Sequence, residues 1–110
     1  MTFFVEQRTG ATIVAVFGEV DLACQALFER LSELTNSPQS GRLIVDLTDC
    51  SYIDSSGLSA LIKTHKCVPG RLVVVASARE AVNRIFSMCG LDTFLRFVST
   101  AAEALPSAAI

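Results

Sequence analysis

Residues 42–58 read R-L-I-V-D-L-T-D-C-S-Y-I-D-S-S-G-L, and they give the strongest indication of the fold class. The apolar run at 42–47 predicts a strand buried on both faces. The polar run at 48–54 predicts an irregular loop. Ser55 then opens a helix that ends at Pro69-Gly70 and carries one apolar face, made by Leu58, Leu61, Ile62 and His65. The stretch is therefore the first half of a strand–helix–strand crossover.

Upstream of this stretch, two β-rich runs at residues 3–8 and 12–17 meet at Thr9-Gly10-Ala11, which predicts a hairpin. Asp21 follows and is expected to cap a helix. The apolar stripe of that helix is Cys24, Leu27, Phe28, Leu31 and Leu34. Chain-breaking residues at 36–41 predict a loop before the strand at 42–47.

Downstream, residues 71–76 (R-L-V-V-V-A) predict a second buried strand. Ser77 and Glu80 have the spacing of a capping box for a third helix, which Gly90 ends. The residues expected to face inward on that helix are Ala78, Ala81, Val82, Ile85, Phe86 and Cys89. Residues 94–98 predict a last strand, and residues 100–103 predict the capped start of a short terminal helix.

Three consecutive strand–helix–strand crossovers predict an α/β fold with right-handed connections. We expect one domain over residues 1–110, with a mixed, mostly parallel sheet of four to five strands packed with about four helices. Loops that leave the carboxyl ends of parallel strands gather at one edge of the sheet. Asp21, Asp54 and Ser55 are therefore expected to be neighbours.

Composition excludes several classes of protein. The chain has 110 residues, of which 51% are hydrophobic and 18% charged, so it can bury a core and is not disordered. A net charge of -2 argues against nucleic-acid binding. The first residues have no basic region and no long apolar run, so no signal peptide or membrane span is expected. We therefore expect a cytoplasmic protein.

The chemistry of the thiols is limited by their spacing. The four cysteines, which do not form a C-x-x-C pair, are Cys24, Cys50, Cys67 and Cys89. Since the chain has one histidine, a zinc site of the usual type is not expected, and no metal site is predicted. In a reducing compartment such thiols are free, although a redox role is left open.

Asp54-Ser55-Ser56-Gly57 is the candidate functional motif. A helix N-terminus offers unpaired N–H groups and a partial positive charge, which suit a phosphate. Gly57 lacks a side chain and is expected to leave room for a partner's backbone beside Ser55. The same four residues also make an ordinary helix cap, so the letters alone leave both interpretations open.

The wider context resembles the STAS family of anti-sigma-factor antagonists. Three motifs stand in the family's order: Gly18-Glu19-Val20-Asp21 after the second strand, the Asp-Ser-Ser-Gly-Leu stretch ending at Leu58, and the helix end at residues 84–91 (R-I-F-S-M-C-G-L). Residues 95–97 resemble the strand that follows. The resemblance runs from about residue 3 to about residue 104.

The resemblance implies a partner switch. The unphosphorylated antagonist binds an anti-sigma factor that is also a serine kinase, which frees a sigma factor; phosphorylation releases the antagonist and a serine phosphatase resets it. Carried onto this chain, Ser55 is the phosphate acceptor, and the residues of the docking surface are Asp21, Asp54, Ser55, Ser56 and Gly57. The chain would be no enzyme and hold no cofactor, because ATP and Mg²⁺ belong to the kinase. No nucleic-acid or membrane partner is implied.

One departure from the family concerns the second helix. The segment between Gly57 and Gly70-Arg71 is shorter than usual by about one helical turn. The helix is therefore predicted to end early, at Cys67-Val68-Pro69.

Three other interpretations compete. A hydrolase nucleophile at Ser55 lacks the Gly-x-Ser-x-Gly pattern, and His65 stands ten residues further along, about 15 Å away on a helix. A receiver domain phosphorylated at Asp46 or Asp49 lacks the lysine expected after the strand at 71–76. A STAS subunit that is never phosphorylated, for instance in a lipid-transport complex, stays open, although the intact Asp-Ser-Ser-Gly favours the switch.

Overall fold

The computed structural model describes residues 1–36 and 41–106, so the expected loop at 36–41 lies mostly outside the described residues. The elements in chain order are β1 (Thr2–Arg8), β2 (Ala11–Val20), α1 (Gln25–Thr35), β3 (Arg42–Ile53), α2 (Ser55–Cys67), β4 (Leu72–Val75), α3 (Glu80–Met88), α4 (Leu91–Phe94), β5 (Arg96–Val98) and α5 (Ala101–Ala104).

The strands form one sheet in the order β1-β2-β3-β4-β5. β1 and β2 are an antiparallel hairpin, turned at Gly10 with a φ of 74° that favours glycine. The other neighbours are parallel. The predicted α/β class with a mixed, mostly parallel sheet is confirmed, and the described part has five strands and five helices, two of them with only 4 residues.

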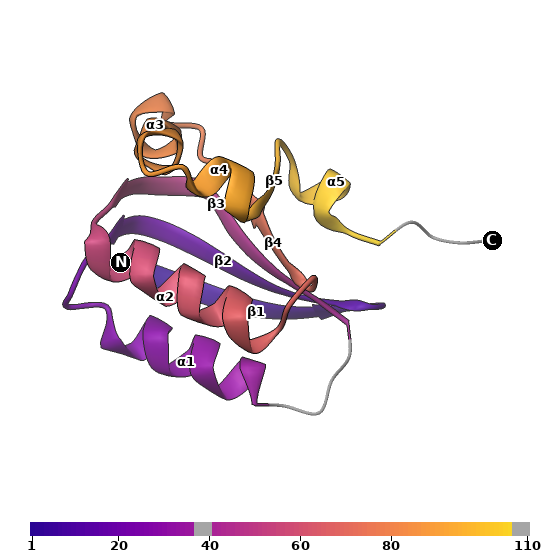
Figure 1. The fold of residues 1–110 in the computed structure, drawn as a ribbon. Coiled ribbons are helices and arrows are strands. Elements are labelled where there is room, and N and C mark those ends of the chain that lie inside the picture. The colour runs from indigo at the N-terminus through magenta and orange to yellow at the C-terminus, as the bar shows by residue number, and fades with distance from the viewer. Residues whose placement is uncertain (37–40, 107–110) are drawn as a thin grey trace.

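Helices cover the two faces of the sheet unequally. α1 and α2 lie side by side along one face, and α5 lies on the opposite side (Figure 1). The larger core fills the first face, where Leu27, Leu31, Leu61 and Phe86 pack on alternate residues of the strands. A smaller cluster fills the second face around Ala104 of α5. The sheet is therefore covered along most of one face and along only part of the other.

The strand β3 is longer than predicted. It continues to Ile53, so the expectation of an irregular loop from residue 48 is wrong. The reason is that β2 is also long, and the parallel pairing runs on to Val20 and Ile53 through two register shifts. Thr48 and Asp49 are exposed at the first shift, whereas Cys50 and Ile53 remain buried in the core. A polar run that looks like a loop is thus a half-exposed strand with bulges.

Two of the predicted helix caps are also wrong. α1 begins at Gln25 after Cys24, and the Asp21 carboxylate instead accepts a hydrogen bond from Ala23 N at 2.9 Å within the preceding turn. α3 begins at Glu80 after Arg79, so Ser77 is too far upstream for a capping box. The spacing of capping residues does not predict where α1 and α3 begin, because in each case the chain turns once before the helix starts.

Other boundaries were predicted well. α2 runs from Ser55 to Cys67, which agrees with an early end, and β4 and α5 lie where they were expected. Thr100 Oγ1 accepts from Glu103 N at 3.2 Å and caps α5. Gly90, with a φ of 73°, follows the end of α3.

The region after the second crossover needs two further corrections. Residues 94–98 are not one strand, because Phe94 ends α4 and β5 starts at Arg96. On α3 only Val82 and Phe86 are buried and Ile85 is half-buried; the expected inward residues that are exposed are Ala78, Ala81 and Cys89.

Candidate functional site

Ser55 is the first residue of α2, and only Asp54 separates it from the end of β3. It is exposed, whereas Ser56 is half-buried. Asp54 is extended (φ -106°, ψ -174°), and its Oδ1 accepts from Ser56 N at 2.9 Å and from Gly57 N at 3.3 Å. The helix is therefore capped by Asp54, and the Ser55 side chain is not needed for the cap.

The end of β2 brings Asp21 to the same edge of the sheet. Val20 and Ile53 are partners in the parallel ladder, and Asp54 N donates to Val20 O at 3.1 Å. Asp21 and Asp54 are the residues that directly follow these two partners, and both are half-buried. The structure thus brings together Asp21, Asp54 and Ser55, as the crossover argument anticipated.

Gly57 has a different surrounding from the one expected. It is buried, and a Cβ added to it would lie 2.6 Å from Ile53 Cγ1 and 2.9 Å from Val20 Cγ1. The space that this glycine leaves is filled by the core and is not open to a partner. Its absent side chain brings α2 close to β2 and β3, which fixes the position of Ser55 two residues earlier.

Two thiols lie beneath this edge. Cys24 Sγ donates to Glu19 O at 3.4 Å, and Cys50 Sγ donates to Tyr52 O at 3.2 Å. Both cysteines are buried, and burial raises the pKa of the Cys50 thiol. Cys67 and Cys89 are exposed, and all four thiols are free in the structure. These buried thiols act as small apolar groups under the two loops.

Ser77 has a positioning role that the sequence did not reveal. It is buried, its Oγ donates to Cys50 O at 2.7 Å, and the same Oγ accepts from Arg79 N at 2.9 Å. Ala78 N also donates to Thr48 O at 3.0 Å. The segment after β4 thus braces the bulged end of β3. No local signal identifies this tie, because its two ends are far apart in sequence.

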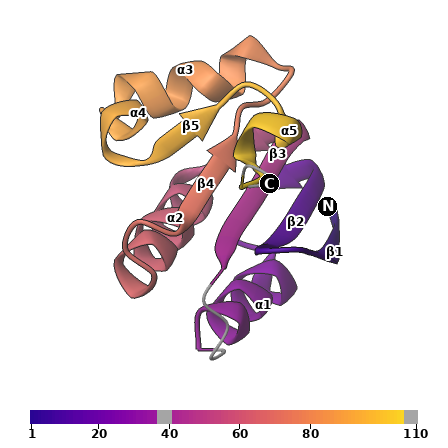
Figure 2. The same ribbon diagram turned by 90° about the vertical axis from the view of Figure 1, so that its right-hand side faces the viewer.

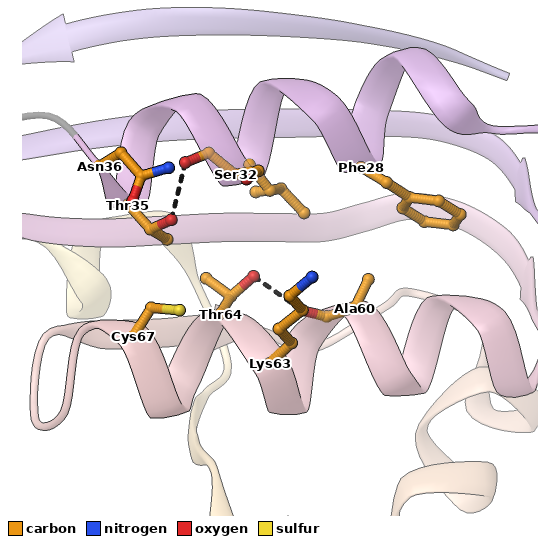
Figure 3. A pocket seen from close by; sticks show the side chains of 9 residues that line it. Phe28, Ser32, Thr35, Asn36, Ala60, Lys63, Thr64 and Cys67 are labelled. Carbon is orange, nitrogen blue, oxygen red and sulfur yellow. Dashed lines mark hydrogen bonds between the residues drawn. The ribbon is translucent and has the colours of Figure 1, made fainter.

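A groove of about 260 Å³ opens between α1 and α2, away from Ser55 (Figure 3). Apolar side chains such as Phe28 and Leu31 line it, and among the described residues that line it Lys63 is the only basic one. Thr35 Oγ1 donates to Ser32 O at 2.8 Å and Thr64 Oγ1 to Ala60 O at 2.7 Å. Since these hydroxyls bond to their own helices, they do not point to a polar ligand.

The structure does not bring His65 to Ser55. His65 lies near the other end of α2, where its ring meets that of Phe94 edge-on at 4.9 Å between centroids. His65 Nδ1 is buried and has no hydrogen-bond partner among the described residues. Over residues 1–36 and 41–106, no group of three or more His, Cys, Asp and Glu side chains could hold a metal ion. The site therefore presents an exposed hydroxyl, and the single histidine of the chain lies near the other end of the same helix.

None of the described helices combines the length and apolar character needed to cross a membrane.

Comparison with known proteins agrees with this architecture. The anti-sigma-F factor antagonist RsfB of Mycobacterium tuberculosis is 27% identical over 106 residues, covering 96% of this chain and 87% of the relative. The anti-sigma-B factor antagonist of Bacillus subtilis is 31% identical over 94 residues, covering 83% and 84%.

A solved structure and a family model also match nearly the whole chain. The crystal structure of an anti-sigma factor antagonist from Mycobacterium paratuberculosis superposes with a TM-score of 0.83 at 27% identity, covering 94% of this chain and 89% of that one. The model of the STAS domain matches residues 3–104. The chain therefore belongs to the STAS domain family.

Proposed function

We propose that this protein is an anti-sigma-factor antagonist controlled by phosphorylation of Ser55. In this proposal the unphosphorylated form binds an anti-sigma factor that is also a serine kinase, and so frees a sigma factor. The names of the relatives support the first half, since they are called antagonists of anti-sigma factors. A partner that holds a sigma factor and uses ATP works in the cytoplasm, and we propose the same location for this chain.

One observation carries the proposal: Ser55 is exposed at the start of α2, and the helix is capped by Asp54 and not by Ser55. The Asp54 carboxylate satisfies the N–H groups of Ser56 and Gly57. A kinase can therefore transfer a phosphate to the Ser55 hydroxyl without disrupting the helix cap. The helix has 13 residues, and its N-terminus favours a negative charge on the added phosphate.

Phosphorylation would then act on binding and not on folding. A phosphate adds about -1.5 to -2 charges at pH 7. Asp21 and Asp54 already give this edge a negative charge, and the kinase's nucleotide brings further phosphates to the interface. Like charges at an interface can cost several kcal/mol, and each 1.4 kcal/mol is about tenfold in affinity. ATP and Mg²⁺ would belong to the kinase, and a serine phosphatase would restore the free hydroxyl.

The first test is phosphate transfer. The protein is incubated with ATP, Mg²⁺ and each serine-kinase anti-sigma factor of the source genome, and its intact mass is measured. We expect one phosphate on the wild type and on Ser56→Ala, and none on Ser55→Ala. Equal transfer to wild type and Ser55→Ala would contradict the assignment, and loss in Ser56→Ala alone would move the acceptor by one residue.

The second test is binding of Ser55→Asp to the same kinase by calorimetric titration. The added carboxylate should weaken binding at least about tenfold, while the circular dichroism spectrum and melting curve stay close to those of the wild type. If Ser55→Asp and the enzymatically phosphorylated protein both bind as tightly as the wild type, Ser55 does not control binding. An assembly subunit that is never phosphorylated would then be the better description.

A further inference from the structure

Three of the four exposed aromatic side chains in the described residues lie on one face of the sheet. Phe4 is 61% exposed, Phe17 38% and Tyr52 46%, while the fourth, Phe94, belongs to α4. We call Phe4, Phe17 and Tyr52 the aromatic face. Exposed apolar side chains are ordinary when scattered, but a contiguous group marks an interaction site.

The register of the strands makes this group contiguous. Phe4 is paired with Ala15, so it lies one pleat from Phe17 on the same side of the hairpin. The two rings meet edge-on, with centroids 5.7 Å apart and planes at 78°. Glu19, one pleat beyond Phe17, is paired with Tyr52 of β3. The three aromatic side chains therefore run diagonally across β1, β2 and β3.

No helix of the described chain covers this end of the sheet. α1, α2 and α3 pack on the other side, with the core around Val14 and Val16. α5 shares the face of Phe17, but its Ala104 packs with Ile13 and Ile44, nearer the start of β2. Figure 2 shows α5 in front of β3 and β4, with β1 and β2 to its side. The aromatic face is thus the uncovered part of this side of the sheet, and the rest of the same side packs against α5.

Charge decides what kind of molecule fits there. The segments that build this corner, residues 1–4, 17–23 and 49–56, contain four acids and neither Lys nor Arg; the acids are Glu19, Asp21, Asp49 and Asp54. On β1 itself Arg8 is paired with Glu6. A second copy of the chain would bring two sets of these acids together, which is unfavourable. A partner with basic residues around an apolar patch is complementary.

The corner is also continuous with the edge that carries Ser55. Tyr52 stands two residues before Asp54, and its ladder partner Glu19 stands two residues before Asp21. Leu22, which is 68% exposed in the turn after Asp21, adds a further apolar side chain beside this edge. A partner that contacts Ser55 is therefore within reach of the aromatic face.

We propose that the aromatic face is the apolar half of the surface that docks the anti-sigma factor, which meets it with apolar side chains surrounded by Lys and Arg. This rests on the proposed function and assigns it a surface outside the Asp21 and Ser55 motifs. Ser55 then switches an interface whose apolar contacts lie on the sheet, and the phosphate need not touch those contacts.

The test compares the aromatic face with an exposed apolar side chain elsewhere on the molecule. Phe4→Thr/Phe17→Thr and Tyr52→Thr keep strand-forming residues on the aromatic face, and Met88→Gln removes an apolar side chain that is 79% exposed on α3. All are made with Ser55→Ala, so that phosphorylation does not interfere. Affinity for the ADP-loaded kinase is measured by calorimetry, and circular dichroism checks the fold. We expect the double variant to lose at least about tenfold in affinity and Met88→Gln to bind like its parent.

The outcomes separate this proposal from the one it rests on. If the parent binds and the double variant binds equally well, the aromatic face is not the docking surface, although Ser55 can still be the switch. If no serine-kinase anti-sigma factor binds the parent, both proposals fail. Sedimentation equilibrium gives a further check: a dimer that the double variant dissociates would assign the face to a second copy and overturn the proposal.

Discussion

The substitution Gly57→Ala tests whether this glycine is required by the core. The added Cβ would lie 2.6 Å from Ile53 Cγ1, 2.9 Å from Ile53 Cδ1 and 2.9 Å from Val20 Cγ1. Ile53 and Val20 are each only 2% exposed, so neither can move into solvent. The void that both residues line has a volume of about 10 Å³, close to the smallest that holds one water. A methyl group is therefore not accommodated without a shift of α2.

Two effects of opposite sign set the magnitude. Gly57 lies in the first turn of α2, where alanine gains at most the advantage of about 0.8–1.0 kcal/mol that it has over glycine in a helix interior. Overpacking a core costs about 1–3 kcal/mol, and contacts this short on buried, branched side chains belong at the upper end. The net loss of unfolding free energy should be about 2 kcal/mol, which for a domain of this size lowers the melting temperature by roughly 8 °C.

Thermal and urea unfolding measure this loss. Ser59→Ala is the matched control, since Ser59 is exposed on the same helix and gains only helix propensity, up to about 0.5 kcal/mol. Combining Gly57→Ala with Ile53→Val removes one of the three clashes, so the pair should cost less than the sum of the single changes. A Gly57→Ala protein as stable as the wild type would refute the packing argument.

Three further predictions follow from the hydrogen bonds and burial of the site. Asp54→Ala should lower the free energy of unfolding by about 1 kcal/mol through loss of the cap, whereas Ser55→Ala should leave urea unfolding nearly unchanged. A thiol reagent should modify only the two exposed cysteines of the native protein at neutral pH, because burial excludes the reagent from the other two and the raised pKa keeps the Cys50 thiol protonated. Mass spectrometry counts the adducts, and the melting temperature should not depend on reductant. Ser77→Ala should cost about 1–3 kcal/mol in urea unfolding by leaving Cys50 O without its donor, with the exposed Ser87→Ala as control.

The crossovers and the helix α2 could be predicted because their signals are local. The apolar runs of β3 and β4, the stop at Pro69-Gly70 and the Asp-Ser-Ser-Gly start all lie within a few residues of the feature they specify. Since parallel strands share one edge for their carboxyl ends, the same signals also predicted that Asp21 and Asp54 are neighbours.

The features that the sequence did not reveal depend on other segments. Residues 48–53 are polar enough to look like a loop, and they form a strand because β2 supplies a partner for that length. Gly57 looks like a residue that leaves surface space, and only the positions of Ile53 and Val20 reveal that the core fills it. The exposure of Phe17 could not be predicted either, because it ends a nearly continuous apolar run in β2 that does not indicate how far the four-residue helix α5 covers the sheet.

The extended end of β3 links these observations. Beyond Leu47 the strand continues for six residues to Ile53, about 20 Å at 3.3 Å per residue. This extension carries Tyr52 onto the open face and Asp54 to the tip, and Ser77 braces it through Cys50 O. If the strand ended at Leu47, Tyr52 would have no ladder partner and Ser55 would not be fixed beside Asp21. The same six residues thus position the serine and complete the aromatic face, so a partner that recognises one is aligned with the other.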